Sequence, residues 1–309
     1  MKRIHKFISW AILLSTLFVG LTSCNQVFAT PTPTPVPTNT PTPTATPLPT
    51  LVPGNIERTV MVNDVKRSYI LHVPSRMDNS QPVPVVFVFH GYSDDAPTIQ
   101  TMTGFDETAD KEGFIVVYPE GVAFSWNAGG CCGSAVDRKI DEQAFVRKML
   151  SDLGTIIEVD LKRIYATGFS NGGMLSYRLA CEMPDVFAAV GPVAGVLTFS
   201  PCEPQETVSL IHIHALDDTI VPFARATFPN FPSTEADITN WARLNECAEP
   251  AKTEKLLNNI LTHTTYNSCK NESAVELYTF ETGKHTWPSK YVWDASQVLW
   301  DFFAAHPKP

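Results

Sequence analysis

An uninterrupted run of apolar residues constrains the fold more than any other feature of this sequence. Residues 85–89 read Val-Val-Phe-Val-Phe. Because successive strand side chains point to opposite faces, a strand with this sequence must be covered on both sides. Further apolar, β-branched runs alternate along the chain with segments of helical periodicity. This alternation favours an α/β fold in which helices cover both faces of one mostly parallel sheet.

The expected elements all lie beyond residue 53. Strands are predicted at residues 69–73, 83–90, 114–118, 163–169, 188–193, 208–214 and 274–280. Helices are predicted at about 99–112, 139–157, 171–183, 234–244 and 292–304. With 309 residues, 44% of them hydrophobic, the chain is large enough to bury one sizeable core. We therefore expect a single folded domain over residues 54–309.

The first 23 residues have the composition of an export signal. Three positive residues (Lys2, Arg3 and Lys6) precede an apolar run at 7–21, which is too short to cross a bilayer comfortably and fits a signal peptide. The run ends in Leu-Thr-Ser followed by Cys24, which resembles the bacterial lipobox, where the cysteine is acylated. The sequence thus predicts an extracellular, lipid-anchored protein at the cell surface. The alternative is an ordinary secretory signal with an incidental cysteine.

Residues 24–53 are expected to form a lipid-anchored linker. From residue 29 they are almost entirely Pro, Thr and small residues, a composition that favours extended polyproline II. At about 3.1 Å per residue, this segment would hold a domain up to ~75 Å from its anchor. It is interpreted either as a stalk that reaches through a cell envelope or as a tether with no further task.

The charge balance excludes one class of partner. The chain has 23 Lys and Arg against 32 Asp and Glu, and its formal net charge is −9. It therefore has no basic excess to hold a nucleic-acid backbone. We expect no nucleic-acid partner, and contact with a membrane only through the N-terminal anchor.

The cysteines favour disulfides over a metal site. Apart from Cys24 the chain has an even number of them, which in an exported protein indicates disulfide bonds. No spacing resembles a zinc site, so no metal is expected. The adjacent Cys131 and Cys132 form either a strained vicinal bridge or two thiols. The expected pairs, each closing a local loop, are Cys181–Cys202 and Cys247–Cys269.

The motif Gly-x-Ser-x-Gly occurs at residues 168–172 between a predicted strand and a predicted helix. A strand, a sharp turn and a helix in this order form a nucleophile elbow, which exposes the serine at a helix N-terminus. The sequence therefore predicts Ser170 as a catalytic nucleophile. The backbone N–H of Asn171 is then placed to stabilise an oxyanion.

A candidate acid and a candidate histidine follow in the chain order Ser, acid, His that such triads use. Asp217 and Asp218 come after the sixth predicted strand and His285 after the seventh, at the sheet edge where ligand sites of open α/β sheets lie. His285 would take the proton from Ser170, and either aspartate could orient its imidazole. The histidines within strands or near the ends are expected to be structural or exposed: His5, His72, His212, His214 and His306.

The second predicted strand ends in Phe-His-Gly-Tyr at residues 89–92. A His-Gly pair at this place usually shapes the loop that supplies the second oxyanion donor. We therefore expect a backbone N–H of Gly91 or of Tyr92 to serve as that donor. The alternative is a tight turn that needs glycine only for its conformation.

Four motifs carry a resemblance to a known family. They read Phe-His-Gly at 89–91, Trp-Asn-Ala-Gly-Gly-Cys-Cys-Gly at 126–133, Gly-Phe-Ser-Asn-Gly-Gly at 168–173 and Gly-Lys-His-Thr-Trp-Pro at 283–288. With them the chain resembles the secreted polyhydroxybutyrate depolymerase-like and feruloyl esterases, akin to family-one carbohydrate esterases. The resemblance covers nearly all of residues 54–309 and implies an α/β-hydrolase fold.

The resemblance also distinguishes between the two aspartates. The family pattern His-x-x-x-Asp-x-x-Val-Pro begins here at His214, which favours Asp218 over Asp217 as the orienting acid. Similar proteins also pair cysteines near positions 247 and 269. Three positions depart from the residues common in the family: Ala215 and Lys284, where glycine is common, and Phe223, where tyrosine is common. Of these, Lys284 changes the charge expected at the mouth of the site.

For function, the resemblance implies hydrolysis of carboxylic esters through an acyl-enzyme, without a cofactor. We expect a monomeric feruloyl esterase that acts on plant xylan or its oligomers, because dedicated polymer depolymerases commonly add a polymer-binding domain for which the residues after His285 leave no room. Acetyl xylan esterase and hydroxybutyrate oligomer depolymerase are the alternatives. Trp126, Phe169 and Trp287 are expected to stack on an aromatic acyl group, and core packing is the alternative for each.

Two further classes of function are open. A non-catalytic surface lipoprotein could bind glycans on the same scaffold, although a binding module has no need for Ser170, Asp218 and His285 together. A peptidase or a thioesterase would use the same triad. Preference for alkyl or aryl esters over peptides and thioesters would separate these enzymes.

Overall fold

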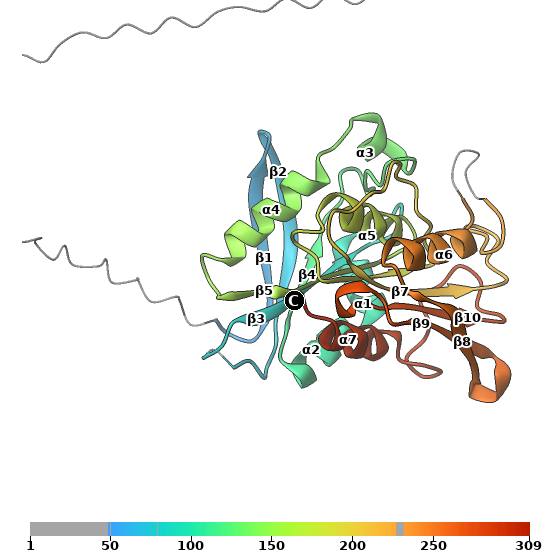
Figure 1. Cartoon of the computed structure of the whole chain (residues 1–309). Helices are drawn as coiled ribbons and strands as arrows, with labels where there is room; N and C mark the ends of the chain where they lie inside the picture. Colours follow the sequence, from blue (N-terminus) through green and yellow to red (C-terminus); the bar gives the residue numbers. More distant parts are fainter. Residues whose placement is uncertain (1–48, 50, 79, 227–231) are drawn as a thin grey trace, which may run out of the picture. The chain divides into compact units, whose positions relative to one another are not determined.

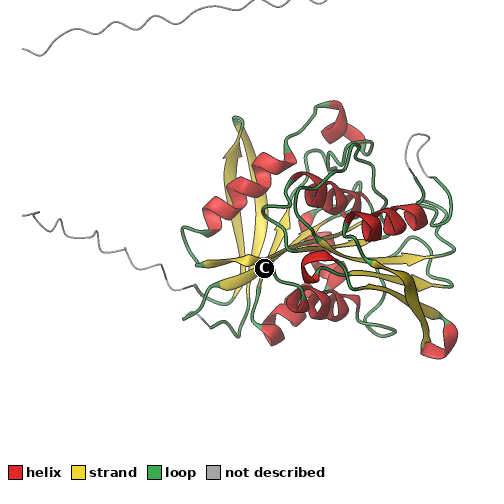
Figure 2. Cartoon of the chain, viewed as in Figure 1, coloured by secondary structure: helices red, strands yellow, loops and turns green. Residues whose placement is uncertain are grey.

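A ten-stranded sheet forms the centre of residues 54–309 in this computed structural model (Figures 1 and 2). The structure describes residue 49 and residues 51–78, 80–226 and 232–309. The expected signal peptide (1–23), Cys24 and most of the expected linker (24–53) lie outside the described residues. Within the described ranges, no helix has both the length and the apolar character needed to cross a membrane.

The sheet is parallel at its centre and antiparallel at its edges. Its order is β1-β2-β4-β3-β5-β6-β7-β10-β9-β8. Neighbouring strands from β4 to β10 run parallel, whereas β1, β2, β8 and β9 pair antiparallel. The strands are β1 (Gly54–Val62), β2 (Val65–Val73), β3 (Val83–Phe89), β4 (Ile115–Pro119), β5 (Val159–Phe169), β6 (Ala189–Val193), β7 (Ser209–Ala215), β8 (Ala248–Leu256), β9 (Leu261–Asn267) and β10 (Val275–Phe280).

Helices cover both faces of the sheet, which confirms the predicted fold class. One face carries α4, α5 and α6, and the other carries α1, α2 and α7 (Figure 1). The helices are α1 (Ala96–Thr103), α2 (Phe105–Glu112), α3 (Gly133–Asp137), α4 (Glu142–Leu153), α5 (Asn171–Glu182), α6 (Thr234–Leu244) and α7 (Ala295–Ala305). Two short 3-10 turns lie at Leu257–Asn259 and Lys270–Glu272.

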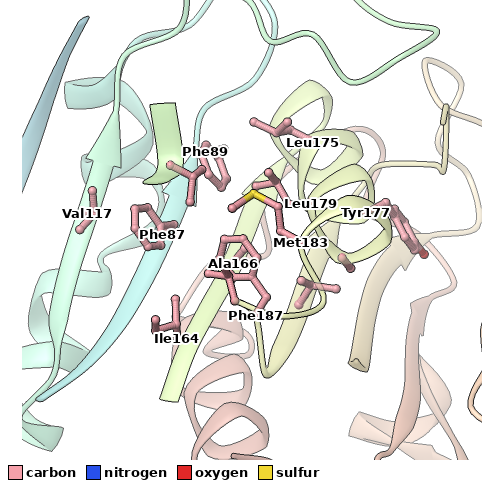
Figure 3. Packing of buried hydrophobic residues seen from close by; sticks show 14 of the residues in the cluster. Phe87, Phe89, Val117, Ile164, Ala166, Leu175, Tyr177, Leu179, Met183 and Phe187 are labelled. Carbon is pink, nitrogen blue, oxygen red and sulfur yellow. The ribbon is translucent and has the colours of Figure 1, made fainter. Parts of the chain in front are cut away.

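The β3 strand shows why this sheet needs both layers of helices. Val85, Phe87 and Phe89 belong to the core beneath α4 and α5 (Figure 3). Val86 and Val88 belong to the separate core beneath α1, α2 and α7. Every residue of the strand is buried, and each Val or Phe side chain removed from water contributes roughly 1.5–3 kcal/mol. A layer missing on either side would forfeit half of that stabilisation.

The predicted strands and helices are present with shifted ends, and one helix prediction was wrong. The periodicity at 99–112 is divided into α1 and α2 by Gly104, which has φ 64° and ends the first helix in the left-handed conformation. Strands β1, β8 and β9 were not predicted. These strands lie toward the edges of the sheet, and their sequences lack continuous apolar runs. In β1, for example, partly buried and exposed side chains alternate.

The cysteines form the two disulfides that the sequence suggested, and also a vicinal one. The vicinal bond joins Cys131 to Cys132, so of the two states left open for this pair the structure contains the bridge. Disulfides are typical of proteins that work in oxidising compartments outside the cytosol. The two longer-range bonds are Cys181–Cys202, at the end of α5, and Cys247–Cys269, beside β8 and β9.

A buried ion pair connects β2, α4 and the loop after β4. Nη1 and Nη2 of Arg67 lie 3.3 and 3.2 Å from Oε2 of Glu142, and the two side chains are 5% and 2% exposed. Oε1 of Glu142 accepts a hydrogen bond from the backbone N–H of Asn127 at 3.1 Å. The Arg67 guanidinium also lies 3.9 Å from the ring centroid of Phe145. Burial lowers the pKa of Arg67 and raises that of Glu142, while their mutual attraction opposes both shifts.

We predict that Glu142→Ala lowers the free energy of unfolding by about 3–5 kcal/mol, because it leaves the Arg67 charge buried without its partner. Urea denaturation would measure the change. The matched control is Asp185→Ala, which breaks the exposed Arg147–Asp185 pair and should cost less than about 1 kcal/mol. Equal losses in the two variants would contradict the structural role given to the buried pair.

Candidate active site

Ser170 lies at a sharp turn between β5 and α5. Its φ of 52° and ψ of −115° place it in a backbone region that residues other than glycine rarely adopt. A Cβ on Gly168 would lie 2.6 Å from the carbonyl oxygen of Phe89, and one on Gly172 would collide with the same atom. The two glycines of the motif are therefore needed because the turn packs directly against the end of β3.

Three loops at the carboxyl edge of the sheet bring Ser170, His285 and Asp218 together. Nε2 of His285 is 2.8 Å from Oγ of Ser170, and Nδ1 of His285 is 2.7 Å from Oδ2 of Asp218. These residues follow β5, β10 and β7, respectively. The hydrogen bonds connect an alcohol, an imidazole and a carboxylate in the order required for nucleophilic catalysis.

The two adjacent aspartates have different partners. The Asp218 side chain is fully buried, and its Oδ1 accepts hydrogen bonds from the backbone N–H groups of Ile220 and Val221 at 2.8 and 2.9 Å. Oδ1 of the partly exposed Asp217 instead accepts from the N–H groups of Gly283 and Lys284, both at 2.8 Å. Asp218 thus contacts the imidazole of His285, while Asp217 holds the loop that carries it.

The environment of Asp218 keeps its carboxyl ionised. Burial acts to raise its pKa, but hydrogen bonds from His214, from His285 and from the backbone of Val221 outweigh burial, and the pKa lies well below the usual range. The carboxylate is therefore negative throughout the neutral range. It can hold the Nδ1 proton of His285 and favour the charged imidazolium.

The first turn of α5 offers free backbone donors beside Ser170. Ser170 occupies the N-cap position, but its side chain makes no capping hydrogen bond, and the first N–H groups of a helix have no partners within the helix. Asn171 begins this turn. Its side chain is fully buried and pairs with the Trp126 backbone, because Oδ1 accepts from the Trp126 N–H at 2.8 Å and Nδ2 donates to the Trp126 carbonyl at 3.2 Å.

The loop after β3 is held by the ring of His90. Nε2 accepts a hydrogen bond from the Gly121 N–H at 2.9 Å, so Nδ1 carries the proton and donates to the Gly91 carbonyl at 2.7 Å. Burial lowers the pKa of His90, which favours this neutral form. Among the described residues, neither the N–H of Gly91 nor that of Tyr92 donates to an acceptor. Either group is therefore available to a bound oxyanion.

The expectation that Trp126 stacks on substrate is not met. Its side chain has no exposed surface, because the indole packs edge-on against Phe89 with the ring centroids 5.2 Å apart. Its Nε1 donates to the carbonyl oxygen of His90 at 2.9 Å. Trp126 therefore joins the loop after β3 to the side chain of Asn171 at the start of α5.

The other two aromatic residues lie nearer the surface, each 7% exposed. The ring centroids of Phe169 and His285 are 4.9 Å apart, so Phe169 borders the triad. Trp287 packs against Phe105, with the ring centroids 6.3 Å apart. A cavity of about 150 Å³ opens beside the loop that carries His285, but its lining includes none of the three predicted aromatic residues. It is lined by Val193, Ile213, His214, Ala215, Phe280, Thr282, Gly283, Thr286, Pro288, Ser289 and Val292.

The sequence did not indicate three contacts that complete the site. They are the backbone pairing of the Asn171 side chain, the hold of Asp217 on the His285 loop, and the approach of His214 Nε2 to within 3.5 Å of Asp218 Oδ2. The four-residue spacing of His214 and Asp218 was the available signal for the last contact. In the described part of the chain, no group of three or more His, Cys, Asp or Glu side chains could hold a metal ion.

Comparisons with known proteins find similarity to esterases. The family model described as esterase PHB depolymerase matches residues 67–220. A putative esterase, NocK, of Nocardia uniformis subsp. tsuyamanensis is 35% identical over 54% of this chain and 49% of its own length. Feruloyl esterase B of Piromyces equi is 26% identical over 74% of this chain and 44% of its own length. The chain thus spans about half the length of each of these relatives.

A solved structure supports the fold independently of sequence. The acetyl xylan esterase from Aspergillus awamori superposes with a TM-score of 0.60 at 16% identity, covering 81% of this chain and 99% of that one. At this identity the likeness concerns the fold alone. Together with the matched family model and the curated relatives, it shows that the chain has the α/β-hydrolase fold and is similar to the esterase PHB depolymerase family and to carboxylic ester hydrolases.

Proposed function

We propose that this protein is a serine carboxylic-ester hydrolase that works through an acyl-enzyme. The observation that carries the proposal is the line of hydrogen bonds from Asp218 through His285 to Ser170, 2.7 and 2.8 Å long. Oγ of Ser170 attacks the ester carbonyl while Nε2 of His285 accepts its proton. The imidazolium then protonates the leaving alcohol, and a water molecule activated by His285 hydrolyses the acyl-enzyme.

The oxyanion of the tetrahedral intermediate would be bound by backbone N–H groups. Asn171 supplies one from the first turn of α5, and Gly91 or Tyr92 supplies the second. In support, Trp126 bridges the two segments through its hydrogen bonds to the His90 carbonyl and to the Asn171 side chain. Donors fixed in this way need no reorganisation when negative charge develops, which is the condition for strong electrostatic stabilisation.

Feruloyl esters of plant xylan, or of its oligomers, are the substrate class that we propose. Support comes from the similarity to a feruloyl esterase and from exposed aromatic side chains at the edge of the sheet that carries the triad. Tyr92 and Phe124 are 55% and 56% exposed, and their loops are joined by a hydrogen bond from Ser93 N–H to the Phe124 carbonyl at 2.8 Å. An exposed aromatic face can stack on a sugar or on a phenolic ring.

Export and lipid attachment at Cys24 belong to the same proposal, and so does a monomeric state. An anchored domain at the end of a proline-rich linker would meet polymers outside the cell. The disulfides are consistent with this location.

We predict that Ser170→Ala lowers kcat by roughly 10⁴–10⁶-fold, because the nucleophile acts as a unit with its base. Hydrolysis of a chromogenic aryl ester would measure the loss. Thermal unfolding should be little changed. Activity that persists in this variant would exclude the proposed acyl-enzyme route.

The two aspartates make a matched pair of variants. Asp218→Asn should lower kcat by about 10⁴-fold, because an amide favours the wrong imidazole tautomer. Asp217→Asn retains an oxygen that can accept from Gly283 and Lys284. It should change kcat by less than about tenfold, the range of one lost neutral hydrogen bond. If Asp217→Asn were the more damaging change, the proposed roles of the two residues would be reversed.

The substrate proposal is tested by the release of ferulate from methyl ferulate and from feruloylated xylan oligomers. Acetylated xylan and hydroxybutyrate oligomers are assayed beside them, with Ser170→Ala as the control for each. We expect ferulate release to show the highest kcat/KM. Faster cleavage of acetyl or hydroxybutyrate esters would keep the triad and overturn the acyl preference. Cleavage of no ester at all would favour a glycan-binding role.

A further inference from the structure

A chain of buried polar side chains extends behind the triad into the core. The Tyr177 hydroxyl lies 2.9 Å from Nδ1 of His212, and Nε2 of His212 lies 2.9 Å from Nδ1 of His214. Nε2 of His214 lies 2.8 Å from the carbonyl oxygen of Val221 and 3.5 Å from Oδ2 of Asp218. Tyr177 lies on the side of α5 opposite to Phe87 (Figure 3).

All side chains in this hydrogen-bonded series are shielded from water. Tyr177 and His212 are 0% exposed, His214 is 2% exposed and Asp218 is 4% exposed. Buried polar atoms without partners are costly, and apolar side chains of similar size would fill the space without that cost. Two neighbouring histidines on the same face of β7 therefore need an explanation beyond core packing.

The contacts determine where each proton lies. Nε2 of His214 faces only acceptors, a carbonyl oxygen and a carboxylate, so this nitrogen must carry a proton. When the His214 ring is neutral, its Nδ1 is an acceptor, and Nε2 of His212 donates to it. Burial lowers the pKa of His212 well below its usual value, so this ring is also neutral. Its Nδ1 accepts the proton of the Tyr177 hydroxyl.

Each hydrogen bond in the series from Tyr177 to His214 is consequently donated in the direction of the loop that carries Asp218. Val221, whose carbonyl oxygen receives the His214 proton, also donates its own N–H to Oδ1 of Asp218 at 2.9 Å. Oδ2 of the same carboxylate is approached from two sides, by His285 at 2.7 Å and by His214 at 3.5 Å. Burial acts to raise the Asp218 pKa, and hydrogen bonding from both His214 and His285 lowers it.

We propose that Tyr177, His212 and His214 form a directed donor relay that positions Asp218 and withdraws negative charge from its Oδ2, so that His214 is a positioning residue for the triad. The inference rests on the proposed function, since it assigns the relay to the acid of that triad. It assigns a role to two histidines that appeared structural in the sequence. The relay moves no proton during turnover, because each member donates to the next throughout.

The relay sets how strongly Asp218 attracts the proton of His285. With the His214 N–H nearby, part of the carboxylate charge is already compensated. Removing this donor would strengthen the attraction of Asp218 for the charged imidazolium, so His285 would stay protonated to a higher pH. Only the unprotonated imidazole of His285 can accept the Ser170 proton. The acid limb of the kcat/KM profile would then move upward in pH.

One other ionisable group acts on the far end of the relay. Asp237 of α6 acts on Tyr177 electrostatically, and burial raises the pKa of Asp237 to about 8 despite a hydrogen bond from the Leu197 N–H. Below that pH Asp237 is neutral and does not disturb the relay. The profile should therefore be recorded between about pH 4 and 7.5.

The test compares four variants of the full-length protein by pH profile. His214→Leu should raise the midpoint of the acid limb by roughly one pH unit and lower kcat about tenfold, with KM little changed. His214→Gln keeps an N–H donor and should recover most of this loss. Tyr177→Phe should shift the midpoint in the same direction by less. Tyr165→Phe is the matched control, because this buried hydroxyl has no hydrogen-bond partner among the described residues, and it should leave the profile unchanged.

A second measurement does not depend on activity. Nitrogen NMR of histidine-labelled protein should show a proton on Nε2 of both His212 and His214. Protonation of either ring at Nδ1 would overturn the relay even if the enzyme is active. Folded His214→Leu protein with an unshifted acid limb would overturn it as well. If the parent protein cleaves no ester, the proposed function fails, and the nitrogen spectra still decide whether the relay exists.

Discussion

The candidate site depends on how closely the start of α5 packs against the end of β3. The carbonyl oxygen of Phe89 leaves no room for a Cβ at Gly168 or Gly172, so the turn that carries Ser170 rests directly on the neighbouring strand. This contact sets the height of the serine relative to the loop after β3. It also allows the unusual backbone conformation of Ser170. An isolated peptide would not maintain this conformation, so the surrounding packing must stabilise it.

Trp126 extends this constraint to the donors proposed for the oxyanion. Its side chain lies entirely in the core, and three of its hydrogen bonds reach the His90 carbonyl and both polar atoms of the Asn171 side chain. The two backbone segments follow different strands, β3 and β5. Because Trp126 contacts both, they can be held together without a direct hydrogen bond between them. The loop around Trp126 is in turn fixed by Glu142, which accepts from the N–H of Asn127. Fold stability and the geometry of the site thus share the same buried polar contacts.

Much of this organisation could be predicted from the sequence, because the relevant signals are local. The apolar run of β3, the glycines around Ser170 and the order of Ser170, Asp218 and His285 each depend on a few neighbouring residues. The role of Trp126 could not be inferred in this way, since an aromatic residue near a motif fits both a pocket and a core. Strands β8 and β9 were missed because their pairing stabilises sequences that carry no apolar run. Contacts between distant segments decided each of these cases.

The adjacent aspartates show why the chemistry of a site requires more than residue types. Asp217 and Asp218 differ by one position, yet Asp217 is partly exposed and holds a loop while Asp218 is buried against two imidazoles. The environment of Asp218 supplies more donors than a carboxylate needs to stay ionised: two backbone N–H groups on Oδ1 and two histidines near Oδ2. A carboxylate held by so many donors is a weaker base than one held by His285 alone. The buried histidines of β7 would then tune the proposed triad from within the core.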